Sequence, residues 1–154
     1  MKIELKNVKY AAFSSQETSC FSASVCVDGK RTGTVSNSGF GGANQYYPNE
    51  LGNFLETYSR NLPDMVCEYG VFPMNADLVI DELLGITLAR KQLIRLMSNR
   101  VVFSRDGKIF QTVKLKDSAM MLCDPDLAKK RLSADVILNL IPLDNAVELF
   151  RGKK

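Results

Sequence analysis

Histidine and tryptophan are both missing from the 154 residues of this sequence. Serine and cysteine hydrolases usually need an imidazole as the base, and catalytic zinc usually takes at least one histidine as a ligand. The lack of histidine therefore argues against these classes of enzyme. It leaves open an enzyme that works through carboxylate pairs, through lysine or tyrosine chemistry, or through a magnesium site.

The sequence has only four cysteines, and no two of them form a CxxC pair. Without histidine to complete a ligand set, neither a zinc site nor a thioredoxin-like redox motif is indicated. Cys20 and Cys26 fall on the same face of one predicted strand but about 20 Å apart, at about 3.3 Å per residue, so the strand cannot bridge them. We expect buried thiols at all four positions: Cys20, Cys26, Cys67 and Cys123.

Long hydrophobic runs are missing as well, since no apolar stretch approaches the roughly 18 residues that span a bilayer. The opening segment, MKIELKNVKY, alternates charged and apolar residues instead of forming the apolar core of a signal peptide. We therefore expect no membrane partner and a cytoplasmic location. Hydrophobic residues make up 45% of the chain and charged residues 24%, as in ordinary folded proteins. The length predicts a single domain over residues 1–154.

The first part of the chain predicts three strands. Residues 20–27 alternate strictly between apolar and small polar side chains, which is typical of a strand with one covered face. Asp28 and Gly29 supply the positive φ angles of a tight hairpin turn, whose loop holds either two or three residues. The predicted strands of this meander are residues 2–13, 20–27 and 30–37.

Helices and a second hairpin are predicted beyond residue 48. A turn at Asp106-Gly107 places Phe103 opposite Phe110 if its loop has two residues. Helical periodicity predicts the following segments: 51–62 after Pro48, 76–98 capped by Asn75 and with a break allowed at Gly85, 118–123, 127–132, 134–141 capped by Ser133, and a last turn or two from Pro142 to Gly152. The chain is thus predicted to be an α+β domain, with a mostly antiparallel sheet packed against helices.

One glycine-rich stretch, VSNSGFGGANQYYPNEL at residues 35–51, invites three interpretations. A strand, a glycine-rich loop and a helix in this order are found at phosphate-binding sites, but neither a Walker spacing nor a dinucleotide fingerprint is present. The loop can instead be structural, with positive φ at Gly39, Gly41 and Gly42. It can also contact a macromolecular partner, since interfaces are enriched in aromatic residues. The candidate partner-binding residues are Phe40, Asn44, Tyr46 and Tyr47.

Charge is unevenly distributed along the chain. Residues 1–89 hold 6 basic and 10 acidic side chains, whereas residues 90–131 hold 11 basic and 4 acidic ones. The basic region can attract nucleic acid, or it can be a solvated helix face. Its candidate nucleic-acid-binding residues are Arg90, Lys91, Arg95, Arg100, Lys129, Lys130 and Arg131.

Acidic residues form one weaker grouping. Asp77 and Asp81 are four residues apart on the predicted helix 76–98, with Glu82 adjacent, so two of them can share a magnesium ion. Acidic side chains in a first helical turn also simply complement the helix dipole. We expect no metal and no cofactor.

Several of these stretches resemble a known group of proteins. The segments KIELKNVKYAAFSSQETSCFSASVCVDGK, GTVSNSGFGGANQYYP, ADLVIDELL and DVILNLIP are similar to small uncharacterised proteins carried by bacteriophages, prophages and plasmids. The resemblance implies a bacterial host cytoplasm and a partner in the host or its defence machinery. It implies no residue roles.

Taken together, the sequence predicts a binding module and not an enzyme. The expected partner is a host protein or nucleoprotein complex, and the expected effect is to counteract host defence. Direct binding of nucleic acid through the region 90–131 is the first alternative. A small nucleotide- or magnesium-dependent enzyme is the second.

Overall fold

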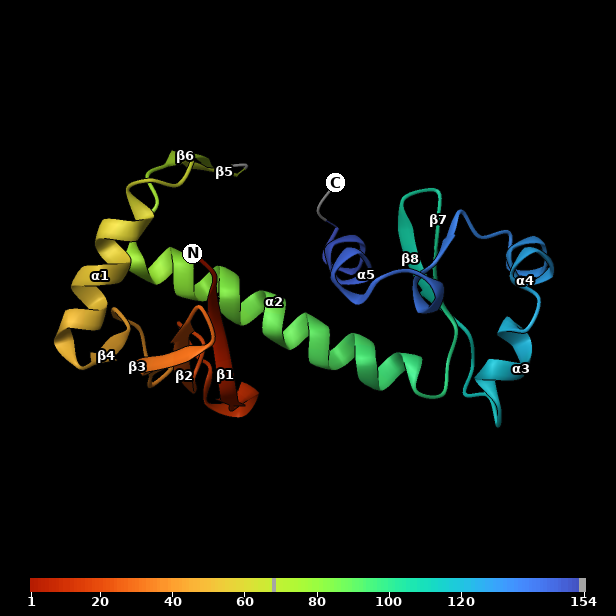
Figure 1. Ribbon diagram of the computed structural model, residues 1–154, viewed down its shortest axis with the longest axis horizontal. Helices are drawn as coiled ribbons and strands as arrows, with labels where there is room; N and C mark the ends of the chain where they lie inside the picture. The colour runs from red at the N-terminus through yellow and green to blue at the C-terminus, as the bar shows by residue number, and fades with distance from the viewer. Residues whose placement is uncertain (68, 153–154) are drawn as a thin grey trace. The chain divides into compact units, whose positions relative to one another are not determined.

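The computed structural model describes residues 1–67 and 69–152, which form two compact units, Met1–Thr87 and Leu88–Lys154. Figure 1 shows the helices and strands of both. Every strand pairing is antiparallel, and helices accompany the sheets, so the predicted α+β class is confirmed. The single domain over residues 1–154 stays a prediction. Each unit is therefore described by itself.

The first unit contains a four-stranded sheet with the strand order β1-β2-β3-β4. Its strands are β1 (Ile3–Tyr10), β2 (Phe21–Val27), β3 (Lys30–Asn37) and β4 (Gln45–Tyr47). The predicted hairpin is confirmed, because Val27 pairs with Lys30 across a two-residue turn with φ of 48° at Asp28 and 82° at Gly29. The predicted first strand was too long, since a 3₁₀ turn, η1 (Ala12–Ser14), replaces its end. Strand β4 was not predicted.

The core of the first unit lies on one face of this sheet. Helices α1 (Asn49–Ser59) and α2 (Ala76–Met97) supply its other half. Close packing is visible at Gly33 of β3, where an added Cβ would lie 2.8 Å from the Leu51 side chain. The buried side chains include Leu5, Val25 and Val35 from the sheet, Leu51 and Leu55 from α1, and Val79, Ile80 and Leu84 from α2. Ser24 and Cys26 on the other face of β2 are buried too, so the strand is more enclosed than its alternation predicts.

Both helix starts can be compared with the sequence. Pro48 is the N-cap of α1, just before the first helical turn in which the sequence places it. Asn75 caps α2 as predicted, because its side-chain oxygen accepts a hydrogen bond of 2.9 Å from the Leu78 amide. Gly85 causes no break in α2. The apolar spacing that predicts α2 places Ile94 on its inner face, but this prediction is wrong: Ile94 is 49% exposed, and Leu93 is fully buried instead.

A short hairpin connects α1 to α2 along the chain. It consists of β5 (Met65–Cys67) and β6 (Gly70–Phe72). The two prolines and the glycine of this segment predict a loop, with at most a short extended piece. Every described residue of these two strands is exposed.

The second unit is built on a three-stranded sheet with the order β8-β7-β9. Strands β7 (Val102–Arg105) and β8 (Lys108–Gln111) form the predicted hairpin, and Phe103 faces Phe110 with ring centroids 5.9 Å apart. The Arg105 guanidinium lies over both rings and donates hydrogen bonds to the carbonyls of Leu132 and Ser133. The helices are α3 (Ser118–Leu122), α4 (Pro125–Leu132) and α5 (Leu143–Phe150).

The prediction of a helix over 134–141 with Ser133 as its cap was wrong. Ser133 instead ends α4 in the left-handed conformation, with φ 47° and ψ 44°. The chain then forms strand β9 (Val136–Ile137), which pairs with β7, and a 3₁₀ turn, η2 (Leu138–Leu140). Burial of Ile137 in the cluster around Phe103 explains why tertiary packing overrides the local helical pattern.

Ser133→Gly is expected to stabilise the second unit by about 1 kcal/mol, because glycine carries no Cβ and tolerates the left-handed conformation. Thermal unfolding followed by far-UV circular dichroism measures the effect. Ser133→Ala is the control, since it removes the hydroxyl but keeps the Cβ, and it should bring no gain. Equal stabilisation by both variants would contradict backbone strain as the cause.

Candidate functional site

The glycine loop, residues 38–44, connects β3 to β4. The predicted positive φ angles are confirmed: 88° at Gly39, 94° at Gly41 and 88° at Gly42. The loop lies against the β1–β2 loop, residues 11–20. The Gly39 carbonyl accepts hydrogen bonds from three successive amides of that loop, at 2.9 Å from Gln16, 3.0 Å from Glu17 and 3.4 Å from Thr18. The two loops are therefore interlocked through their backbones.

Asn37, at the end of β3, is the centre of this interlock. Its side-chain oxygen accepts hydrogen bonds from the Thr18 hydroxyl at 2.7 Å and from the Gly39 amide at 2.9 Å. Its side-chain nitrogen donates to the Gly42 carbonyl at 3.2 Å and to the Asn44 side-chain oxygen at 3.1 Å. The Asn37 side chain is buried and is hydrogen-bonded at both of its polar atoms, so it fixes the shape of both loops.

Two of the three glycines also lie close to the neighbouring loop. A Cβ on Gly39 would overlap the Ser14 carbonyl oxygen and lie 2.8 Å from the Cys20 Cβ. A Cβ on Gly41 would lie 2.5 Å from a carboxylate oxygen of Glu17. Gly42 has nothing within 4 Å of the added atom. The contact with backbone therefore makes glycine necessary at position 39, whereas at position 41 the Glu17 side chain can move aside.

This geometry differs from a phosphate cradle. The Gly39 amide donates to Asn37 and the Gly41 amide donates to the Thr18 hydroxyl at 3.3 Å, so both already have acceptors within the protein. Strand β4 separates the loop from α1, so the loop does not open into a helix N-terminus. The phosphate-binding arrangement relies on free amides and on that N-terminus.

The four predicted partner-binding residues fall into two pairs. Phe40 and Tyr47 are 64% and 76% exposed. Tyr46 and Asn44 are bonded within the unit, since the Tyr46 hydroxyl donates to Asp77 at 2.6 Å and the Asn44 amide donates to the same carboxylate oxygen at 3.3 Å. Burial, and then the hydrogen bond to Asp77, raise the pKa of Tyr46. The sequence alone could not distinguish the two pairs.

Phe13 is an exposed aromatic residue that sequence reasoning missed. It was assigned to the end of the first strand, but it lies in η1 and is 92% exposed. Ser14 and Gly39 are in contact where the two loops interlock. Phe13 is the residue before Ser14, and Phe40 is the residue after Gly39. Phe13 and Phe40 therefore lie on the two interlocked loops, which are at the same end of the sheet. We call this pair the phenylalanine surface.

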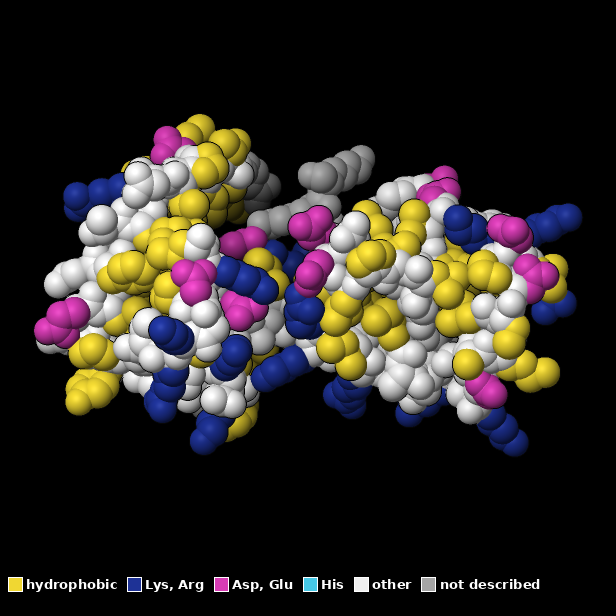
Figure 2. All heavy atoms as spheres, in the orientation of Figure 1, with side chains coloured by type: hydrophobic (Ala, Val, Ile, Leu, Met, Phe, Trp, Pro, Cys, Tyr) yellow, Lys and Arg dark blue, Asp and Glu magenta, His cyan; other side chains and the backbone are white. Residues whose placement is uncertain are grey.

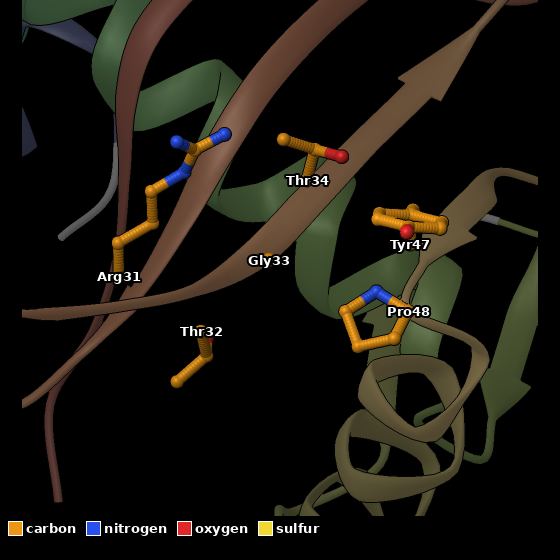
Figure 3. Close-up of a pocket in the computed structure, with 6 residues that line it drawn as sticks. All are labelled: Arg31, Thr32, Gly33, Thr34, Tyr47 and Pro48. Carbon is orange, nitrogen blue, oxygen red and sulfur yellow. The ribbon is translucent and has the colours of Figure 1, made fainter.

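A second feature of the first unit is an open hollow of about 290 Å³ on the sheet. It is lined by Arg31, Thr32, Gly33, Thr34, Tyr47 and Pro48, which Figure 3 shows as sticks. In that view the Arg31 guanidinium and the Tyr47 ring lie on opposite sides of Thr34. The six lining residues combine a cation, an aromatic ring and two threonine side chains, and none of them is acidic.

Two of the candidate nucleic-acid-binding residues in the predicted basic region interact with other groups of the protein. Arg90 pairs with Asp144, and the Arg100 guanidinium donates to the Thr112 carbonyl at 3.4 Å. Arg95 and Lys91 are exposed near the end of α2. Three further candidates occupy the last turn of α4, where positive charge complements the helix dipole: Lys129, Lys130 and Arg131. The seven residues thus lie on α2, on the turn after it and on α4.

Of the two aspartates grouped on α2, Asp77 is already hydrogen-bonded within the first unit. Asp77 accepts the bonds from Tyr46 and Asn44, while burial, and then the charge of Asp77, raise the pKa of Asp81. Within residues 1–67 and 69–152, no three histidine, cysteine, aspartate or glutamate side chains come together as metal ligands.

The cysteines are free thiols. Cys26 is buried, but Cys67 and Cys123 are exposed, so the predicted burial of these two thiols was wrong.

Comparison with known proteins gives no family, since no family model, curated protein or solved structure matches this chain. None of the helices in the described part of the chain has both the length and the apolar character needed to cross a bilayer.

Proposed function

We propose that this protein is a non-enzymatic binding module that captures a protein partner through the phenylalanine surface. The observation that carries the proposal is the contrast at the interlocked loops. The side chains of Phe13 and Phe40 are exposed, whereas the backbone beside them is fixed by Asn37 and by the Gly39 carbonyl.

Physical chemistry supports an interface at this place. A phenylalanine side chain buries 150–250 Å² when it is covered, so it contributes strongly to association. Apolar side chains that are exposed together are typical of interaction surfaces. Fixed loops lose little conformational entropy on binding, which leaves more of the contact energy available for affinity. The proposed partner therefore presents apolar pockets that accept two aromatic side chains.

The sequence resemblance gives this proposal its biological setting. It implies a gene of a phage, prophage or plasmid that acts in a bacterial host. We propose a host protein or nucleoprotein complex as the partner, with loss of a host defence as the consequence. Nucleic-acid binding through residues 90–131 and a nucleotide- or magnesium-dependent enzyme stay alternative predictions.

The double variant Phe13→Ser/Phe40→Ser tests the proposal. Tagged wild-type and variant proteins are used as baits in host lysate, with and without nuclease, and captured proteins are quantified by mass spectrometry. Since central aromatic residues of interfaces contribute about 2 kcal/mol each, we expect a loss of captured partner of at least about tenfold. Nuclease treatment should leave the capture unchanged.

Tyr69→Ser is the matched control. Tyr69 is 83% exposed in the same unit but lies outside the interlocked loops, so this variant should capture the partner as the wild type does. Unchanged capture by the double variant would overturn the role of the phenylalanine surface. Loss of capture on nuclease treatment would favour a nucleic-acid bridge instead.

A further inference from the structure

The sheet of the first unit has a second face, opposite its core, with a distinct chemistry. The strand register places two complete rows of side chains across all four strands on this outer face. One row is Lys6, Ser24, Thr34 and Tyr47, and the other is Lys9, Ser22, Ser36 and Gln45. A third, shorter row is Glu4, Cys26 and Arg31. Apart from Tyr47 and Cys26, the outer face is polar.

Positive charge collects on these strands although the unit as a whole is acidic. Residues 1–47 contain 5 basic and 3 acidic side chains, whereas residues 48–87 contain 1 basic and 7 acidic ones. Lys6, Lys9 and Arg31 are exposed on the outer face, and its one acidic residue, Glu4, is paired with Lys2 at 2.7 Å. Figure 2 shows several Lys and Arg side chains over β1 to β3. The outer face therefore attracts anions.

The hollow beside Tyr47 adds an aromatic platform to this cationic face. Tyr47 and Thr34 belong to the same cross-strand row as Lys6, and Arg31 lines the hollow from the neighbouring row. Gly33 also lines the hollow, and an added Cβ at this position would overlap the Tyr47 carbonyl oxygen and meet the core side chain of Leu51. The exposed Tyr47 ring therefore borders an open hollow that Arg31 also lines, with Thr34 between the ring and the guanidinium (Figure 3).

We propose that this outer face binds single-stranded nucleic acid. An exposed aromatic ring gives a stacking platform for an unpaired base, and lysine and arginine beside it contact the phosphates. The hydroxyls of Ser22, Thr34 and Ser36, which are exposed or half-buried, can donate to phosphate or sugar oxygens. The row from Lys6 to Tyr47 crosses three inter-strand steps, or about 14 Å, so one short stretch of the strand spans cation and ring.

The aromatic ring decides between possible anionic partners. A duplex keeps its bases stacked on one another and offers Tyr47 no free base face. An acidic protein surface can pair with the lysines, but it offers no planar group to stack on the Tyr47 ring in the hollow that Arg31 also lines. This inference goes beyond the proposed function and uses different residues, so the two can fail independently.

Binding is tested by fluorescence anisotropy with a labelled oligo-thymidine of about 12 nucleotides and with a duplex of the same length. We expect the full chain to bind the single strand more tightly. Tyr47→Ser should weaken this binding by roughly 5- to 150-fold, the range of one lost base stack, whereas Tyr47→Phe should retain it. Thermal unfolding of both variants should match the wild type, because Tyr47 is exposed.

The cations are tested by salt dependence between about 50 and 200 mM. Lys6→Gln/Lys9→Gln should weaken binding and reduce the slope of log affinity against log salt by about 1.4, as expected for two lost phosphate contacts to a single strand. Lys114→Gln/Lys116→Gln in the second unit makes the same change of charge at exposed positions and is the control. Phe13→Ser/Phe40→Ser should bind oligonucleotide normally.

Three results would overturn the inference. The first is no binding of the single strand at about 50 mM salt. The second is equal affinity for single strand and duplex together with normal binding by Tyr47→Ser, which would indicate attraction of any polyanion. The third is displacement of the single strand by an equal concentration of poly-glutamate, which would indicate an acidic protein partner.

Discussion

Gly39→Ala is expected to lower the free energy of unfolding of the first unit by about 3 kcal/mol. An alanine held at the φ of 88° found at this position is strained by about 1 kcal/mol or more. Its Cβ also meets the Ser14 carbonyl oxygen, and forcing an atom into a packed site costs a further 1–3 kcal/mol. All five tyrosines lie before residue 88, so denaturation followed by tyrosine fluorescence reports on the first unit alone.

Gly42→Ala is the matched control for this prediction. Gly42 has the same φ of 88°, but an added Cβ meets nothing within 4 Å. This variant should lose only the conformational part, about 1 kcal/mol. Equal losses in the two variants would mean that the contact between the glycine loop and Ser14 contributes nothing to stability.

Asn37→Ala is expected to destabilise the first unit by about 2–4 kcal/mol, again measured by tyrosine fluorescence. The change removes four hydrogen bonds, and it leaves the Gly39 amide and the Thr18 hydroxyl without their acceptor. A buried polar group that loses its partner costs about 1–3 kcal/mol. Because Asn37 fixes both loops, the variant should also weaken partner capture through the phenylalanine surface.

Ser38→Ala is the control that distinguishes the loss of the Asn37 hydrogen bonds from the effect of any substitution at this end of β3. Ser38 is adjacent in sequence and exposed, and its substitution should alter stability by less than about 0.5 kcal/mol. If Asn37→Ala were as mild as this control, the hydrogen bonds of Asn37 would not hold the loops together.

Local chemistry explains which parts of the fold could be predicted. The two Asp-Gly turns, the pairing of Phe103 with Phe110 and the helix that begins after Asn75 all follow from residues close together in the chain. Ser133 shows the limit of this reasoning. Its role depends on Ile137 joining a buried cluster with Phe103, a contact between distant residues that no local pattern encodes.

The candidate site was predicted in part for the same reason. Positive φ at the three glycines is a local property, and it was confirmed. The separation of exposed Phe40 and Tyr47 from internally bonded Asn44 and Tyr46 depends on Asp77, more than 30 residues further along the chain. Strand β4 and the exposure of Phe13 likewise result from tertiary contacts.

The hydrogen bond from Tyr46 to Asp77 also changes one expectation from the sequence. The sequence groups Tyr46 and Tyr47 together as candidate partner-binding residues. On that grouping alone, removing both rings is expected to weaken partner capture and to leave stability nearly unchanged. Because the Tyr46 hydroxyl donates to Asp77, its removal should instead destabilise the unit. Tyr47, which is exposed on the outer face, remains suitable as a surface variant.

Amide hydrogen exchange by NMR tests most directly whether the interlocked loops form a fixed platform. The Gly39 amide donates to the buried Asn37 side chain, whereas the Gly42 amide donates to no acceptor within the described part of the chain. We predict strong protection at Gly39, comparable to the amides of β2, beside fast exchange at Gly42. Exchange of both glycine amides at the rate of an unstructured peptide would contradict the account.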